Sequence, residues 1–74
     1  MIKIYTKYNC MPCQMTKNLF KKFGIEYEEI NLEENEEAKT YISEVLRYKT
    51  APVVVTDNDS WAGFNPNKIR NLRG

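Results

Sequence analysis

The stretch Thr6-Lys7-Tyr8-Asn9-Cys10-Met11-Pro12-Cys13-Gln14-Met15 contains both cysteines of the chain. Before it, Ile2-Lys3-Ile4-Tyr5 alternates apolar and polar residues, which predicts a β-strand. After it, apolar residues recur at helical spacing from 12 to 23, with Pro12 in the first turn and Gly24 beyond the last. The cysteines therefore lie where a strand passes into a helix.

The rest of the chain predicts three further strands and two further helices. They are expected at 25–32 (strand), 38–46 (helix), 52–56 (strand), 60–62 (strand) and from Asn65-Pro66 onward (helix). Strands joined by a helix should be parallel, and the last two strands should form an antiparallel hairpin. We expect a single α/β domain over 1–74 with the order βαβαββα, in which a four-stranded mixed sheet is flanked by three helices.

The segment 25–37 leaves one question open. Its apolar residues change parity between Tyr27 and Ile30, which allows either a β-bulge or burial on both faces of the strand. The acidic run at 33–37 has a simple explanation, because a helix N-terminus favours negative charge.

The composition argues against several classes of function. With 42% apolar or aromatic and 28% charged residues, the chain resembles folded globular proteins. Its 11 basic and 10 acidic residues give a net charge of +1, too weak to attract nucleic acid or an anionic membrane. No apolar run approaches the roughly 20 residues of a membrane span, and the N-terminus lacks a signal-peptide pattern. We expect a cytoplasmic monomer that binds neither nucleic acid nor membrane.

A metal site and a structural disulfide both explain the cysteine pair poorly. Zinc would need two further Cys or His ligands, and the chain has no histidine and no other cysteine, so only a metal or cluster shared between chains remains. A disulfide across so short a loop constrains the unfolded chain very little. C-x-x-C between the strand and helix of a βαβ unit is typical of redox proteins, so a thiol-disulfide oxidoreductase is the favoured interpretation.

The two cysteines should have different roles. Cys10 precedes the helix, where unpaired N–H groups and the helix dipole stabilise a thiolate, so it is the expected nucleophile. Cys13 lies on the buried helical face and is the expected resolving thiol, which attacks a mixed disulfide at Cys10. Lys7 would add positive charge near the thiolate, with a solvated lysine as the alternative, and Pro12 would stiffen the helix start.

Residues distant in sequence are candidates for the same site. If the Ala51–Pro52 bond were cis, the backbone of Ala51 would be presented to a visiting peptide, although the residues alone do not decide this. Trp61 and Phe64 are either core residues or flank the groove of a partner. Tyr8 would either contact a partner or shield the disulfide.

Three motifs together resemble the thioredoxin superfamily and, within it, the glutaredoxin-like NrdH redoxins. They are Cys10-Met11-Pro12-Cys13, Thr50-Ala51-Pro52-Val53-Val54 and Trp61-Ala62-Gly63-Phe64-Asn65-Pro66. The resemblance covers nearly the whole chain and implies a thioredoxin fold with Pro52 cis and facing the cysteines. Tyr8 replaces the proline of the family's T-K-P-x-C, and Ala62 and Asn65 replace the serine and arginine of W-S-G-F-R-P, so docking contacts of those two side chains would be lost.

The resemblance also implies a dithiol electron carrier without a bound cofactor. Its oxidant would be the large subunit of class Ib ribonucleotide reductase, in deoxyribonucleotide synthesis, and its reductant would be thioredoxin reductase, which takes electrons from NADPH. The implied contacts to substrate or partner are made by Lys7, Tyr8, Met11, Pro12, Ala51, Trp61, Gly63 and Phe64, beside Cys10, Cys13 and Pro52.

A glutathione-dependent dithiol glutaredoxin is the alternative. Such proteins usually bind glutathione through a Gly-Gly-x-x-Asp stretch, and the corresponding Ala62-Gly63-Phe64-Asn65 lacks the aspartate. A charge-assisted contact of that kind is worth about 1.5–3 kcal/mol, so its loss disfavours glutathione. A cluster-binding subunit or a binding module without redox activity is a more distant alternative.

Overall fold

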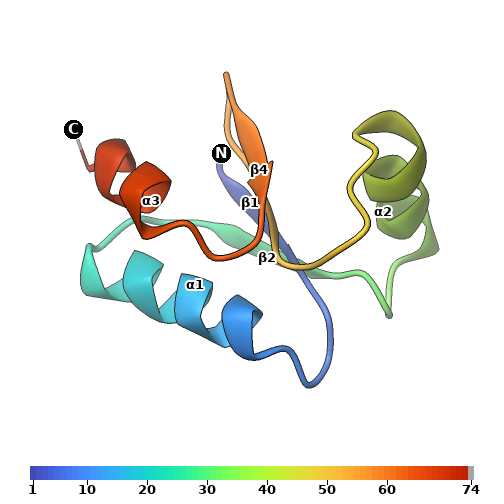
Figure 1. Cartoon of the computed structure of the whole chain (residues 1–74), viewed down its shortest axis with the longest axis horizontal. Helices are drawn as coiled ribbons and strands as arrows, with labels where there is room; N and C mark the ends of the chain where they lie inside the picture. Colours follow the sequence, from blue (N-terminus) through green and yellow to red (C-terminus); the bar gives the residue numbers. More distant parts are fainter. Residues whose placement is uncertain (74) are drawn as a thin grey trace.

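The computed structural model describes residues 1–73 and has the expected order of strands and helices (Figure 1). The elements are β1 (Lys3–Thr6), α1 (Met11–Lys22), β2 (Glu28–Asn31), α2 (Glu36–Thr40) with the π-helical turn η1 (Tyr41–Val45), β3 (Val53–Val55), β4 (Ser60–Ala62) and α3 (Pro66–Leu72). The strand order is β2-β1-β3-β4, with β1 and β2 parallel and the other pairs antiparallel. The predicted mixed sheet is thereby confirmed.

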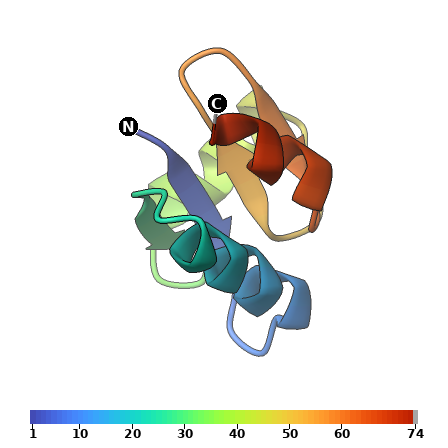
Figure 2. The same cartoon turned by 90° about the vertical axis from the view of Figure 1, so that its left-hand side faces the viewer.

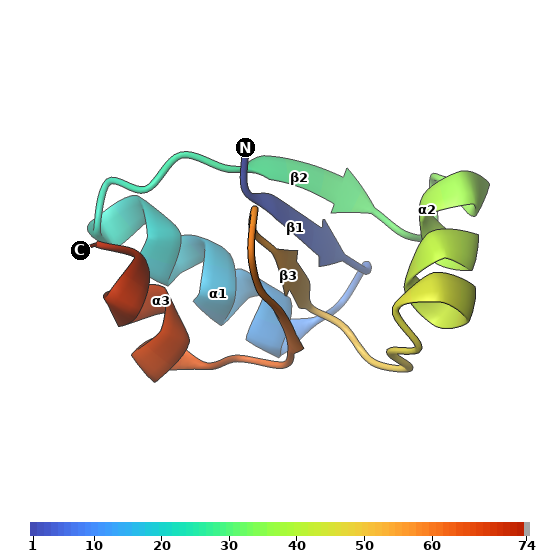
Figure 3. The same ribbon diagram turned by 90° about the horizontal axis from the view of Figure 1, so that it is seen from above.

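The helices cover both faces of the sheet. On one face, α1 and α3 pack Phe20 and Ile69 against Ile4 and Val54. Figure 2 shows these two helices in front of the sheet, and Figure 3 shows α2 on its opposite side. There Ala38 and Ile42 pack with Tyr5, Leu32 and Val53 in a second apolar cluster.

The structure shows that the change of apolar parity in the segment 25–37 reflects burial on both faces of the sheet and not a β-bulge. Its pairing with β1 is continuous from Lys3 opposite Glu28 to Thr6 opposite Asn31, so no residue is bulged out. Tyr27, just before the strand, packs edge-on against Phe20 of α1 with ring centroids 5.4 Å apart. Ile30 belongs to the apolar cluster on the α2 side. The strand itself is shorter than the predicted 25–32.

The predicted helix over 38–46 differs from the structure. It begins earlier, because Asn35 caps it by accepting a 3.0 Å hydrogen bond from the N–H of Ala38. The π-helical turn then changes the angular spacing of the side chains, which leaves Val45 65% exposed although the helical pattern placed it on the buried face. Arg47, in the left-handed region at φ 61°, follows the end of this turn.

Helix α3 begins as predicted. The side-chain oxygen of Asn65 accepts a 3.2 Å hydrogen bond from the N–H of Lys68, and Pro66 occupies the first helical position. Within residues 1–73, none of the helices is both long enough and apolar enough to cross a membrane.

Candidate functional site

The cysteines form a disulfide at the N-terminal end of α1. Their Cα atoms are 5.2 Å apart, and Cys10 is the N-cap residue, with extended backbone angles. The Sγ atom of Cys10 accepts a 3.2 Å hydrogen bond from the N–H of Cys13. Cys10 is half-buried, whereas Cys13 is only 1% exposed. The local structure therefore makes the two sulfurs unequal in access to solvent.

A tight loop carries the chain from β1 to Cys10. Asn9 adopts the left-handed conformation at φ 52°, which asparagine tolerates better than most residues. The N–H of Tyr8 donates a 2.7 Å hydrogen bond to the carboxylate of Glu33, which fastens the loop to the segment after β2. Neither Asn9 nor Glu33 was predicted to support the site, and only the turn-forming tendency of asparagine hints at the first.

A buried threonine braces the first turn of α1. The Thr16 side chain is fully buried, and its hydroxyl donates a 2.8 Å hydrogen bond to the carbonyl oxygen of Pro12. Thr16 follows Cys13 by three positions on the buried helical face. The sequence offers one signal for this contact, because Thr16 places a hydroxyl on a helical face that is otherwise apolar.

The chain enters β3 at the end of the sheet where β1 leads to Cys10, because β3 is antiparallel to β1 with Val53 beside Tyr5 (Figures 1 and 3). The Ala51–Pro52 peptide bond is cis. The Pro52 side chain is fully buried, while Ala51 is half-buried. Ala51 is therefore the more accessible of these two residues.

The predicted aromatic residues separate into two environments. Trp61 is only 6% exposed and packs in the core with Ile4 and Phe20, so it does not flank an open groove. Phe64 is half-buried and packs against the same cluster. Tyr8 is 54% exposed and lies just before Cys10.

Two methionines of α1 add exposed apolar surface beside the disulfide. Met11 is 71% and Met15 is 44% exposed. They are four residues apart, so they lie on one face of the helix. Met15 was not among the predicted site residues, and its helical spacing from Met11 is the feature of the sequence that relates the two.

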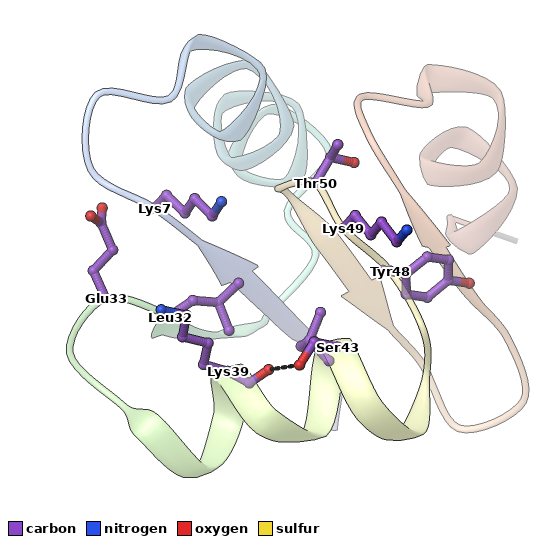
Figure 4. A pocket seen from close by; sticks show the side chains of 9 residues that line it. Lys7, Leu32, Glu33, Lys39, Ser43, Tyr48, Lys49 and Thr50 are labelled. Atoms are coloured by element: carbon purple, nitrogen blue, oxygen red, sulfur yellow. Dashed lines mark hydrogen bonds between the residues drawn. The ribbon is translucent and has the colours of Figure 1, made fainter.

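A pocket of about 380 Å³ lies between the loop after β1, the α2–η1 helix and the segment before β3 (Figure 4). The pocket brings Lys7, which was a predicted site residue, together with residues that are distant in the sequence and were not predicted to belong to the site. The lining residues are Lys7, Leu32, Glu33, Lys39, Ile42, Ser43, Tyr48, Lys49 and Thr50.

An ion-pair network joins α1 to the sheet. Glu29 of β2 accepts hydrogen bonds of 3.0 Å from the Lys17 ammonium and 2.9 Å from the buried Thr6 hydroxyl. Burial raises the pKa of Glu29, but these hydrogen bonds and the charge of Lys17 outweigh it and hold the pKa below its ordinary value. Over the described residues 1–73, no cluster of three or more His, Cys, Asp or Glu residues is placed to hold a metal ion.

Comparison with known proteins agrees with this geometry. The sequence model of the glutaredoxin family matches residues 2–61. The Gene 56 protein of Mycobacterium phage D29 is 39% identical over 72 residues, which cover 96% of this chain and 80% of that protein. The glutaredoxin-like protein NrdH of Lactococcus lactis (strain IL1403) is 33% identical over 72 residues, covering 97% and 99%.

A solved structure extends the likeness to the backbone. The glutaredoxin-like NrdH-redoxin from Escherichia coli superposes with a TM-score of 0.91 at 34% identity, covering 96% of this chain and 92% of that one. The expected thioredoxin fold is thereby confirmed, and the chain belongs to the glutaredoxin family, with NrdH proteins among its relatives.

Proposed function

We propose that this chain is a small dithiol redox carrier that reduces protein disulfides through Cys10 and Cys13. One observation carries the proposal: the half-buried Cys10 caps α1 and its sulfur accepts the Cys13 N–H, while the Cys13 sulfur is shielded. A hydrogen bond to sulfur from a helix N-terminus stabilises the thiolate, which is the form that attacks disulfides.

The reaction proceeds in two exchanges. The Cys10 thiolate attacks one sulfur of the substrate disulfide, forms a mixed disulfide and releases the other substrate sulfur as a thiolate. Cys13, after losing its proton, then attacks the Cys10 sulfur and releases the second substrate thiolate. Two electrons pass to the substrate, and the protein is left with the Cys10–Cys13 disulfide, which is the state seen here.

The surface near the sulfurs supplies the substrate contacts in this proposal. The backbone of Ala51, placed by Pro52, pairs with an extended peptide segment. The exposed side chains of Tyr8 and Met11 supply apolar contact beside Cys10. Lys7, Pro12, Gly63 and Phe64 complete the proposed contact surface, whereas the buried Trp61 supports it from the core.

The physiological partners belong to the proposal as well. We assign thioredoxin reductase, with NADPH, as the reductant and the large subunit of class Ib ribonucleotide reductase as the oxidant, in the cytoplasm. The NrdH-named relatives support this assignment, and the E. coli protein is described as having a thioredoxin-like activity profile. The segment 62–65 also lacks the aspartate with which glutaredoxins usually bind glutathione.

Oxidation of NADPH tests the proposal. The protein is mixed with insulin as the disulfide substrate and with either thioredoxin reductase or glutathione plus glutathione reductase. We expect turnover with thioredoxin reductase and little with glutathione, and none in either system for Cys10→Ser. Turnover only in the glutathione system would refute the assignment of thioredoxin reductase as the reductant. Turnover catalysed by the Cys10→Ser variant would refute the dithiol mechanism.

A further inference from the structure

The pocket beside the proposed redox site has a strongly basic rim. Lys7 comes from the loop after β1, Lys39 from α2 and Lys49 from the segment before β3. Figure 4 shows these side chains reaching the pocket from three separate segments. We call the pocket that they border the lysine cleft.

The positive charge of the lysine cleft is not neutralised within the described part of the chain. Among residues 1–73, no ammonium group of the three lysines lies within 4.0 Å of a carboxylate oxygen. Glu33 is the one acidic residue of the lining, so three positive charges less one negative charge leave an excess of two. Its carboxylate already accepts the N–H of Tyr8, and the nearby Glu37 lines a different pocket.

Beneath this rim the cleft is apolar. The side chains of Leu32 and Ile42 are 5% and 3% exposed and belong to the core on the α2 side of the sheet. Tyr48 borders the cleft, with its hydroxyl hydrogen-bonded to the Ser60 hydroxyl at 2.9 Å. An apolar floor under unpaired ammonium groups fits a peptide segment that carries carboxylates beside an apolar side chain.

The position of the cleft relates it to the sulfurs. Lys7 precedes Cys10 by three residues, and Thr50, at the edge of the cleft, precedes Ala51 directly. A peptide joined to Cys10 and paired with the backbone at Ala51 would continue along Thr50 and Lys49. Three extended residues span about 10 Å, so the segment of the substrate within three residues of its cysteine is the part that we expect to extend over the cleft.

We propose that the lysine cleft binds Asp or Glu side chains that lie within about three residues of the disulfide in a protein substrate. Charge complementarity is the argument for this occupant, and the inference rests on the proposed dithiol function. The cleft would thereby select acidic substrate segments by speeding their encounter and holding them beside Cys10.

Paired peptides test this inference without a reductase. The protein is reduced, freed of reductant and mixed with one of two cystine peptides, and the exchange is stopped by acid and quantified chromatographically. One peptide carries Asp and Glu on both sides of the cystine, and the other carries Asn and Gln at the same positions. The native protein should reduce the acidic peptide about 3- to 10-fold faster at low salt.

Salt and substitution locate the effect. The acidic-to-neutral rate ratio should fall toward 1 between about 20 mM and about 300 mM NaCl, because screening weakens exposed charge pairs. At low salt it should also fall toward 1 in the Lys39→Gln, Lys49→Gln double variant. Lys22→Gln, which removes an exposed lysine at the far end of α1, is the matched control and should keep the native ratio.

The outcomes separate this inference from the proposed function. Equal rates for both peptides, or an unchanged ratio in the double variant, would overturn the acidic-substrate inference while leaving the dithiol function intact. Failure to reduce either peptide would overturn the dithiol function itself. If oxidised glutathione showed the same dependence on Lys39 and Lys49, the occupant would be a small thiol and the commitment to a protein segment would be wrong.

Discussion

The N–H of Gly63 donates a 2.7 Å hydrogen bond to the carbonyl oxygen of Pro52, so the turn after β4 holds the start of β3 in place. This contact relates the motif at 61–66 to the proposed substrate groove in structural terms. Under the proposed function the motif would support the groove through this backbone contact, since Pro52 and Trp61 are themselves buried.

Gly63→Ala should impair both stability and turnover. Gly63 has φ +86°, where an added Cβ is strained although it would meet no atom within 4 Å, so we expect a loss of about 1 kcal/mol. Gly24→Ala is the matched control, because Gly24 has φ +68° and equally open surroundings far from the groove. Urea unfolding should show similar losses of stability in the two variants, whereas the rate of insulin reduction should fall only in Gly63→Ala. An equal fall of that rate in both variants would argue against a specific role of Gly63 in the proposed groove.

The two cysteines should behave differently when replaced singly. Cys13→Ser should accumulate a mixed disulfide with a substrate through Cys10, because no resolving thiol remains to release it. Cys10→Ser should form none, because the remaining sulfur is only 1% exposed. Intact-mass spectrometry after mixing with a disulfide peptide checks this, and trapping through Cys13 would reverse the assigned roles.

Arg47→Gly should stabilise the fold. Arg47 has φ 61° after the π-helical turn, and the N–H of Tyr48 returns to the carbonyl oxygen of Ile42 at 3.0 Å. Glycine adopts this conformation without steric cost, so the free energy of unfolding should rise by about 0.5–1 kcal/mol. Thermal unfolding should then shift upward by about 3–6 °C. Arg47→Ala keeps a Cβ atom, so an equal gain in that variant would attribute the effect to charge instead.

Glu29→Gln should change the dependence of stability on pH. The pKa of Glu29 is lowered in the folded protein, so its stabilisation is present above the unfolded pKa and is lost as the pH falls through the folded pKa. Its side chain is 39% exposed, so solvent screening limits the loss in the variant to about 0.5 kcal/mol near pH 7. Once the pH lies below the folded pKa of Glu29, the native protein and the variant should become equally stable.

Urea titrations across this range measure the effect. Glu34→Gln, which alters an exposed glutamate outside the network, should follow the native curve at every pH. A constant difference between Glu29→Gln and the native protein across the whole range would show that the carboxylate charge does not contribute.

The order of elements and the place of the cysteines were accessible from the sequence because they depend on local patterns. Periodicity identified α1, and Asn65-Pro66 identified the start of α3, since capping involves residues close in the chain. The exposure of Val45 was not accessible, because a π-helical turn depends on how the helix packs. The burial of Trp61 likewise depends on contacts with distant helices.

The candidate site divides in the same way. The roles expected for Cys10 and Cys13 follow from their position at a helix start, and they remain predictions until the variants are measured. The lysine cleft had no local signature, because Lys7, Lys39 and Lys49 meet only after the chain has folded. The left-handed conformation of Asn9 could not be predicted for a related reason. The loop that contains it is held by the hydrogen bond from the Tyr8 N–H to Glu33, which is distant in the sequence.

The sheet ends in two outer strands, β2 and β4, each with one side not paired to a neighbour. Such edges are templates on which other chains aggregate. In β2 the exposed Glu28 would bring like charges together if two copies paired there, and β4 is only three residues long. Both edges therefore disfavour pairing of the sheet in one molecule with the sheet of the next.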